Sequence, residues 1–192
     1  MSHPGGASGG RALLLLDFQY DFLADDGRMP VARHQVPQVL ATTRTYIGTA
    51  TAAGAVVIKI GNEFRRTDLV RNLLRRRAAI EGAGGTAWDP LVDSPGAIYI
   101  PKWKGDAFCN PALRATLTEG GIEDVALAGL FAAACITATA KTALALGLRV
   151  RLLADAIACR TDASRQSALS HLSSLGAQLV SPGDPWETGG HE

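Results

Sequence analysis

The chain has 192 residues, of which 47% are hydrophobic, so it has enough apolar side chains for a sizeable core and is not a wholly disordered chain. Its 19 basic and 18 acidic residues leave a net charge of +1, which lacks the basic excess of a dedicated nucleic-acid-binding protein. Its cysteines, Cys109, Cys135 and Cys159, cannot all pair and lack the close spacing of a zinc site. We therefore expect a reduced, cytoplasmic protein.

The two ends of the chain are polar and rich in glycine. Residues 1–10, MSHPGGASGG, lack the charged and apolar segments of a signal peptide, so we expect a disordered tail there and a loose C-terminus at 189–192. The apolar run at 12–16 is far too short to span a bilayer. We expect one domain over residues 11–188, with neither a membrane nor a nucleic acid as its partner.

Within this domain, short apolar runs alternate with helical stretches. The expected strands are residues 12–16, 54–60, 97–100, 124–128, 149–153 and 177–180. The expected helices are residues 34–52, 67–80, 111–118, 135–146 and 162–175, with threonines at 67 and 161 as caps and glycines at 54, 147 and 176 as stops. This alternation predicts an α/β fold, in which a parallel sheet has helices on both faces.

Three residues with reactive side chains follow strands. Asp17 follows the first strand, Lys102 follows the third, and Cys135 follows the fourth after a gap of six residues, in the first turn of the next helix. The carboxyl ends of parallel strands share one edge of a sheet, so we expect the three residues to lie there together. A helix N-terminus lowers a thiol pKa. Asp17 could accept the thiol proton, and Lys102 could hold Asp17.

Each of these residues also has a structural interpretation. Cysteine is often a small buried apolar residue, an aspartate after a strand often caps a turn, and most lysines are solvated. Their shared position at strand ends favours catalysis but does not decide it.

Four motifs resemble those of the isochorismatase-like cysteine hydrolases, and together they cover nearly all of residues 11–181. They are LLLDFQYDF at 14–22, KWKGDAF at 102–108, AGLFAAACITATA at 128–140 and LADA at 153–156. The resemblance implies a catalytic triad of Asp17, Lys102 and Cys135, and a three-layer Rossmann-like sandwich with six strands in the order 3-2-1-4-5-6. It also implies a cis peptide bond between Leu130 and Phe131, and an oxyanion hole formed by the backbone N–H groups of Phe131 and Cys135.

The resemblance also separates the possible chemistries. Relatives that hydrolyse the vinyl ether of isochorismate lack the cysteine. Nicotinamidases carry an Asp-x-His metal motif after the second strand, where this chain has GNEFRR at 61–66 without a histidine. The resemblance therefore favours a hydrolase without metal or cofactor that cleaves the C–N bond of a small amide, ureide or lactam through a thioester. A vinyl-ether hydrolase and a catalytically silent binding or scaffold protein remain alternatives.

The substrate pocket and the assembly are expected from position and from the resemblance. The expected pocket residues are Phe18, Phe22, Glu63, Arg65, Trp103 and Phe108. The aromatic residues are equally typical of core packing. The arginines around residues 65–77 are more typical of a solvated or intersubunit face, and the alternative is that Arg65 or its neighbour Arg66 binds an anionic substrate group. Because relatives commonly assemble, we expect a homodimer or homotetramer with contacts from the alanine-rich residues 132–145 and the arginine-rich residues 67–80.

Overall fold

The computed structural model describes residues 10–180, 183, 185 and 186 of the chain. Residues 1–9 and 189–192, where we expected loose tails, lie outside the described residues. Gly10, which we assigned to the tail, is instead the first residue of a strand.

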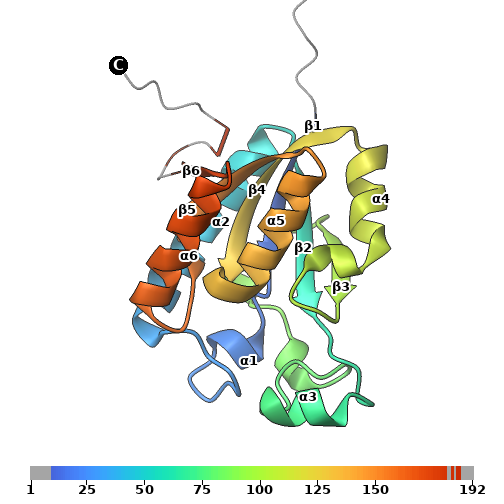
Figure 1. The fold of residues 1–192 in the computed structure, drawn as a ribbon, viewed down its shortest axis with the longest axis vertical. Coiled ribbons are helices and arrows are strands. Elements are labelled where there is room, and N and C mark those ends of the chain that lie inside the picture. The colour runs from blue at the N-terminus through green and yellow to red at the C-terminus, as the bar shows by residue number, and fades with distance from the viewer. Residues whose placement is uncertain (1–9, 181–182, 184, 187–192) are drawn as a thin grey trace, which may run out of the picture.

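Six parallel strands form the centre of the molecule (Figure 1). They are β1 (Gly10–Leu16), β2 (Val56–Asn62), β3 (Ile98–Lys102), β4 (Ile122–Leu130), β5 (Arg149–Ala158) and β6 (Gln178–Val180). Their order is β3-β2-β1-β4-β5-β6, as expected. Ala12 and the four leucines that follow it in β1 are fully buried, because a central parallel strand is covered by helices on both faces.

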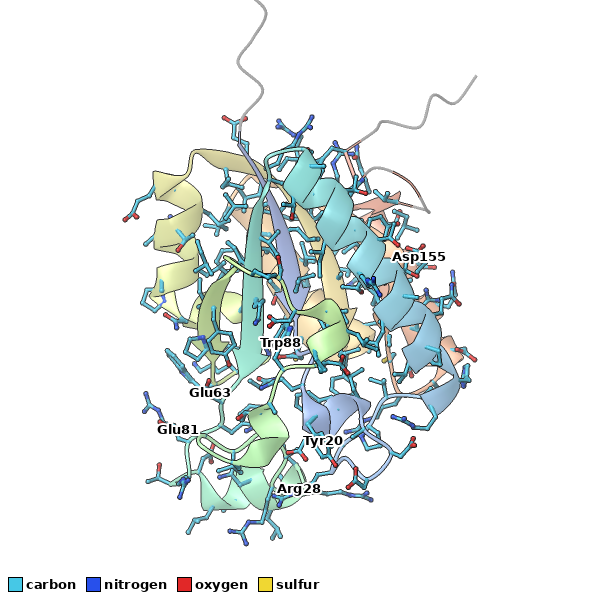
Figure 2. All side chains as sticks on the ribbon, turned by 180° about the vertical axis from the view of Figure 1, so that it is seen from behind. Tyr20, Arg28, Glu63, Glu81, Trp88 and Asp155 are labelled. Atoms are coloured by element: carbon cyan, nitrogen blue, oxygen red, sulfur yellow. The ribbon has the colours of Figure 1, made fainter. Side chains whose placement is uncertain are left out.

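Helices cover both faces of the sheet. One face carries α2 (Val36–Ala52), and the other carries α5 (Thr137–Ala145) and α6 (Asp162–Ser174), while α4 (Pro111–Glu119) lies near β3 (Figures 1 and 2). Thr161 caps α6 by accepting a hydrogen bond from the Ser164 N–H, as its position predicts. None of the helices in the described ranges has both the length and the apolar character needed to cross a bilayer.

The helix expected over residues 67–80 is much shorter, since α3 spans only Leu69–Leu74. Arg76, Arg77 and Ala79 after it have positive φ angles of 53°, 60° and 47°, which a right-handed helix excludes. The buried carboxylate of Asp21 accepts a hydrogen bond from the Ala79 N–H at 2.8 Å. Asp21 belongs to a short helix that we did not predict, α1 (Tyr20–Leu23), so a contact between distant segments determines where α3 ends.

Strand β5 is longer than expected, because it continues past residue 153 to Ala158. Leu127 of β4 pairs with Leu152, whereas Gly129 pairs with Ile157, so the residues between these pairs bulge out of the regular ladder. Within this bulge, Asp155 accepts a hydrogen bond from the hydroxyl of Tyr46 on α2 at 2.9 Å. Asp155 therefore connects β5 to α2 and lies away from the sheet's carboxyl edge (Figure 2).

Candidate active site

Asp17 lies at the first turn after the central strand. It is fully buried and has a φ angle of 64°, a left-handed conformation that aspartate adopts more readily than most residues. Beside it, Leu16 of β1 pairs with Gly129 of β4. A Cβ atom on Gly129 would lie 2.2 Å from the Leu16 carbonyl oxygen, so glycine is needed for this close approach.

Lys102 contacts both of the other predicted catalytic residues, Asp17 and Cys135. It is the last residue of β3, which is separated from β1 by β2, a distance of about 10 Å at the usual strand spacing. Its long side chain is fully buried, and its Nζ lies 3.0 Å from Asp17 Oδ2 and 3.3 Å from Cys135 Sγ. The structure thus brings Asp17, Lys102 and Cys135 together at the carboxyl edge of the sheet.

Asn62 is a further site residue, which we did not predict. It ends β2, the strand between Asp17 and Lys102. Its Oδ1 accepts a hydrogen bond from Lys102 Nζ at 2.8 Å, and its Nδ2 lies 3.9 Å from Cys135 Sγ. Buried Gln19 holds Asn62 through hydrogen bonds to both its backbone N–H and its carbonyl oxygen. The position of Asn62 at a strand end was the signal that could have identified it.

Cys135 lies in a wider turn than the regular helix that we expected. The chain leaves β4 through a cis peptide bond between Leu130 and Phe131. It then forms a π-helical turn, Ala132–Ile136, before α5 begins at Thr137. Single π-helical turns are frequent at functional sites. Phe131 directly precedes this turn and Cys135 lies within it; the role of their backbone N–H groups as an oxyanion hole stays a prediction.

Burial controls the protonation of the site. It raises the pKa of Asp17 even though the charge of Lys102 lowers that pKa. Burial also raises the pKa of the Cys135 thiol to about 11, aided by the charge of Asp17 and opposed by Lys102. For Lys102, burial lowers the pKa, but the charges of Asp17 and Cys135 outweigh it and raise the pKa. The expected lowering of the thiol pKa by a helix N-terminus is therefore wrong, and a nearby base must remove the thiol proton.

The Cys135 side chain borders a cavity of about 370 Å³, the size of a small-molecule site. Phe22, one of the expected pocket residues, lines this cavity. The full lining is Phe22, Met29, Asn62, Phe64, Arg75, Gly105, Phe131, Ala133, Ala134, Cys135, Cys159, Arg160 and Ser164.

The other five expected pocket residues do not line this cavity. Phe18 is buried against the Trp88 ring, with the ring centroids 5.9 Å apart. Glu63 accepts a hydrogen bond from the Tyr99 hydroxyl at 2.7 Å. The Arg65 guanidinium lies over the Trp103 ring, 5.6 Å from its centroid. Phe108 borders a separate, smaller cavity with Arg114. Their closeness in sequence to the catalytic residues did not place these side chains in the cavity.

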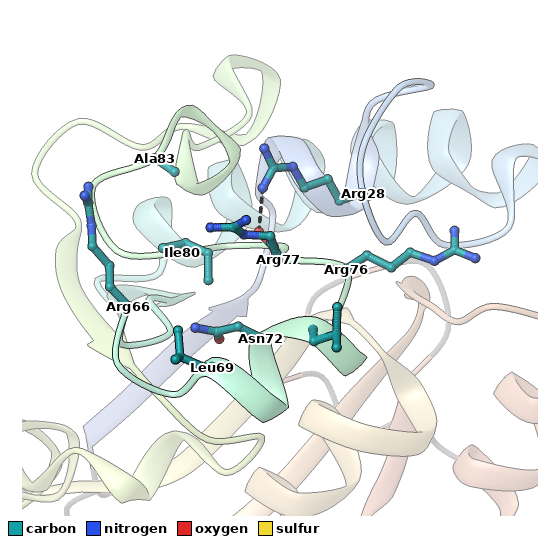
Figure 3. A pocket seen from close by; sticks show the side chains of 9 residues that line it. Arg28, Arg66, Leu69, Asn72, Arg76, Arg77, Ile80 and Ala83 are labelled. Carbon is teal, nitrogen blue, oxygen red and sulfur yellow. Dashed lines mark hydrogen bonds between the residues drawn. The ribbon is translucent and has the colours of Figure 1, made fainter.

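A second and larger cavity lies beside α3 and contains none of the triad residues (Figure 3). Its volume is about 640 Å³, and it is lined by Arg28, Arg66, Leu69, Asn72, Leu73, Arg76, Arg77, Ile80 and Ala83. Arg28 donates a hydrogen bond to the Arg77 carbonyl oxygen at 2.8 Å. Arg66, which we considered as a binder of the substrate's anionic group, faces this second cavity and not the one beside Cys135.

Comparison with known proteins places the chain in a family. The Isochorismatase domain matches it over residues 11–182. The chain belongs to the isochorismatase family. It is similar to a streptothricin hydrolase of Streptomyces noursei, with 30% identity over 149 residues, which are 76% of this chain and 53% of that protein. The chain spans about half the length of the streptothricin hydrolases that it matches.

Other relatives of this isochorismatase family member include amidohydrolases. The ureidoacrylate amidohydrolase of Enterobacter sp. (strain 638) is 25% identical over 155 residues, which are 68% of this chain and 67% of that protein. Two solved structures support the fold. Pyrazinamidase/nicotinamidase from Streptococcus mutans UA159 has a TM-score of 0.81 at 24% identity and covers 89% of this chain and 100% of its own. N-carbamoylsarcosine amidase from Thermoplasma acidophilum has a TM-score of 0.78 at 23% identity, and the match covers 94% of this chain and 99% of the amidase chain.

Proposed function

We propose that the protein hydrolyses a C–N bond of a small amide, ureide or lactam through a thioester on Cys135. The contact of one buried ammonium, Lys102 Nζ, with both Asp17 and Cys135 carries this proposal. It supports the proposal because a carboxylate, an ammonium and a thiol lie together beside a cavity. The ureidoacrylate amidohydrolases among the relatives support the same class of reaction.

In the first stage, Asp17 removes the thiol proton and the thiolate attacks the substrate carbonyl carbon. The raised pKa of Asp17 makes this carboxylate a stronger base than an ordinary aspartate. Lys102 balances the negative charge at the thiolate, and Asn62 holds the Lys102 ammonium in place. The N–H groups of Phe131 and Cys135 stabilise the oxyanion of the tetrahedral intermediate.

In the second stage, the intermediate collapses and the C–N bond breaks. The nitrogen takes the proton from Asp17 and leaves as an amine or ammonia, and Cys135 keeps the acyl group as a thioester. Water then attacks the thioester, with Asp17 again accepting a proton. The thiolate leaves as the new C–O bond forms, and Asp17 returns the proton to it. The reaction consumes one water and needs no redox step.

A panel of primary amides, ureides and lactams tests this function by the release of ammonia or amine. We expect turnover of at least one class, and acid-quenched samples should show Cys135 carrying the mass of the acyl group. An isochorismatase-type enzyme would instead hydrolyse a vinyl ether and release no amine. A silent binding protein would hydrolyse nothing and form no adduct, so either result would overturn the proposal.

Exhaustive chelation should leave the activity intact. Among the residues that the structure describes, no group of three or more histidine, cysteine, aspartate or glutamate side chains is arranged to hold a metal ion. The triad also supplies its own nucleophile, without a metal-bound water. The rate is measured before and after dialysis against a chelator. Loss of activity that zinc, iron or manganese restores would contradict the metal-free mechanism and favour a nicotinamidase-like one.

We expect the protein to form a homodimer or homotetramer. The side chains of Leu69, Val70, Leu73 and Leu74 on α3 are 74–79% exposed in the single chain. Exposed apolar side chains gathered in this way are typical of surfaces that another protein covers, and symmetric self-association is the common case. Light scattering coupled to size exclusion tests this at micromolar concentration. A single species near 20.1 kDa would show that the chain is a monomer.

A further inference from the structure

The charged side chains that line the cavity beside Cys135 are all positive. Among the described residues, its charged lining consists of Arg75 and Arg160, and no carboxylate lines it. The triad adds no net charge, because the buried carboxylate of Asp17 pairs with the Lys102 ammonium and the high pKa of Cys135 keeps its thiol neutral. The two arginines therefore set the sign of the potential in the cavity.

Arg160 is placed to bind a ligand in this cavity. It follows β5, and its guanidinium lies over the Phe131 ring, 5.9 Å from the ring centroid. No carboxylate in the described part of the chain lies within ion-pair distance of it. The nearest acidic residue in sequence, Asp162, is held by His34 at 3.0 Å and Gln35 at 2.6 Å. The exposed guanidinium of Arg160 thus faces the cavity without an internal carboxylate to compete with a ligand.

Arg75 adds a second positive charge from a different part of the fold. It follows α3 and lies over the Phe64 ring, 3.8 Å from the ring centroid. Phe64 and Phe131 both line the cavity, together with Phe22 and Met29. Each arginine is therefore backed by an aromatic ring, which fixes its planar group by cation–π contact. The remaining walls suit an apolar substrate body.

We propose that this cavity selects substrates that carry a carboxylate in addition to the scissile amide or ureide group. Arg160 binds the carboxylate, since a guanidinium matches the two oxygens of a carboxylate. Arg75 strengthens the attraction. The inference rests on the proposed function, because it names the substrate class of the same cavity. It replaces the prediction that Arg65 or Arg66 binds the anionic group.

Two alkylating reagents test the charge preference without a known substrate. Iodoacetate and iodoacetamide react at the same type of carbon, but only iodoacetate carries a carboxylate. Labelling of Cys135 is followed by mass spectrometry, and the iodoacetate rate is divided by the iodoacetamide rate. The ratio is compared with that of free N-acetylcysteine. Since both reagents attack the same thiolate, this comparison cancels differences in the amount of thiolate.

We expect the ratio for Cys135 to exceed that of N-acetylcysteine by about tenfold, as a hydrogen bond to a charged group would produce. Arg160→Gln should remove most of this preference, and Arg160→Glu should bring the ratio below the N-acetylcysteine value. Arg75→Gln should lower it about threefold, the effect of a weaker charge contact. Arg114→Gln, at the separate cavity beside Phe108, is the matched control and should leave the ratio unchanged.

A ratio equal to that of N-acetylcysteine, or one that persists in the Arg75→Gln/Arg160→Gln double variant, would overturn the inference. The result is separate from that for the proposed function. A Cys135 that reacts with iodoacetamide no faster than Cys109 or Cys159 would count against an activated nucleophile. The ratio of the iodoacetate rate to the iodoacetamide rate can be measured even if Cys135 is labelled slowly. The charge preference is therefore decided whether or not Cys135 is an activated nucleophile.

Discussion

Replacement of Cys135 by alanine is expected to lower kcat by about a thousandfold or more for any substrate that the panel identifies, because the variant cannot form the thioester. Cys135 is buried and lines the cavity, with its Sγ 3.3 Å from Lys102 Nζ. Alanine removes the sulfur and leaves the surrounding turn its own backbone hydrogen bonds, such as that from the Ile136 N–H to the Phe131 carbonyl. We therefore expect the free energy of unfolding to change by only about 1 kcal/mol.

Steady-state kinetics and urea unfolding measure the two quantities on the same preparation. Cys109→Ala is the matched control, since it removes a thiol outside the cavity and should retain most of the activity. Cys135→Ala with most of its activity intact would rule out the covalent route. Loss of activity together with loss of folding would instead show that Cys135 has a structural role.

Lys102→Ala is expected to destabilise the protein by about 3–5 kcal/mol at neutral pH, because it leaves the buried Asp17 carboxylate without its counter-charge. Both side chains are fully buried and 3.0 Å apart. The variant should also lose activity by orders of magnitude, because the thiolate loses the ammonium beside it. Lys104→Ala, two residues away and exposed, is the matched control and should change neither property.

The destabilisation should depend on pH. Burial already raises the pKa of Asp17 in the native protein, and removal of Lys102 raises it further. A carboxyl group whose native-state pKa is raised contributes stability below its unfolded-state pKa, and this contribution is lost as the pH rises through the native-state pKa. The stability loss should therefore be larger near pH 8 than near pH 5, at about the two ends of the range of usual maximal stability.

Urea unfolding midpoints at the two pH values test this dependence. An Asp17→Asn/Lys102→Met double variant removes both charges and should recover part of the lost stability. Asparagine suits the positive φ angle of Asp17. An equal loss at both pH values, or no recovery in the double variant, would contradict an uncompensated Asp17 charge as the cause.

Local sequence signals were sufficient to locate the strands. Each strand is an apolar run bounded by glycine, proline or a polar residue, and each was predicted within a few residues at its N-terminal end. The parallel arrangement then places every strand's carboxyl end at one edge, so the grouping of Asp17, Lys102 and Cys135 followed from topology. The strand order itself came from the family resemblance and not from residue patterns.

Contacts between distant segments decided the rest of the site. Asp21, far away in sequence, accepts a hydrogen bond from the Ala79 N–H, and the Ala79 carbonyl accepts one from the Phe64 N–H. These long-range contacts hold the segments before and after α3, from which Phe64 and Arg75 line the cavity. Asn62 is a site residue because it ends β2, which lies between β1 and β3. The Lys102 side chain extends from β3 across β2 towards Asp17, and on the way it donates a hydrogen bond to the Asn62 side chain.

The sequence by itself determined the α/β class, the strands and the three residues at their ends, because these depend on hydrophobic runs and turn residues that lie close together in the chain. Only the tertiary structure decided the protonation of Cys135, whose pKa burial raises to about 11, and the charge of the cavity, which Arg75 and Arg160 supply. A pKa depends on how completely a group is removed from water, and a cavity wall depends on which segments fold over it. Both are properties of packing, which no local pattern of residues specifies.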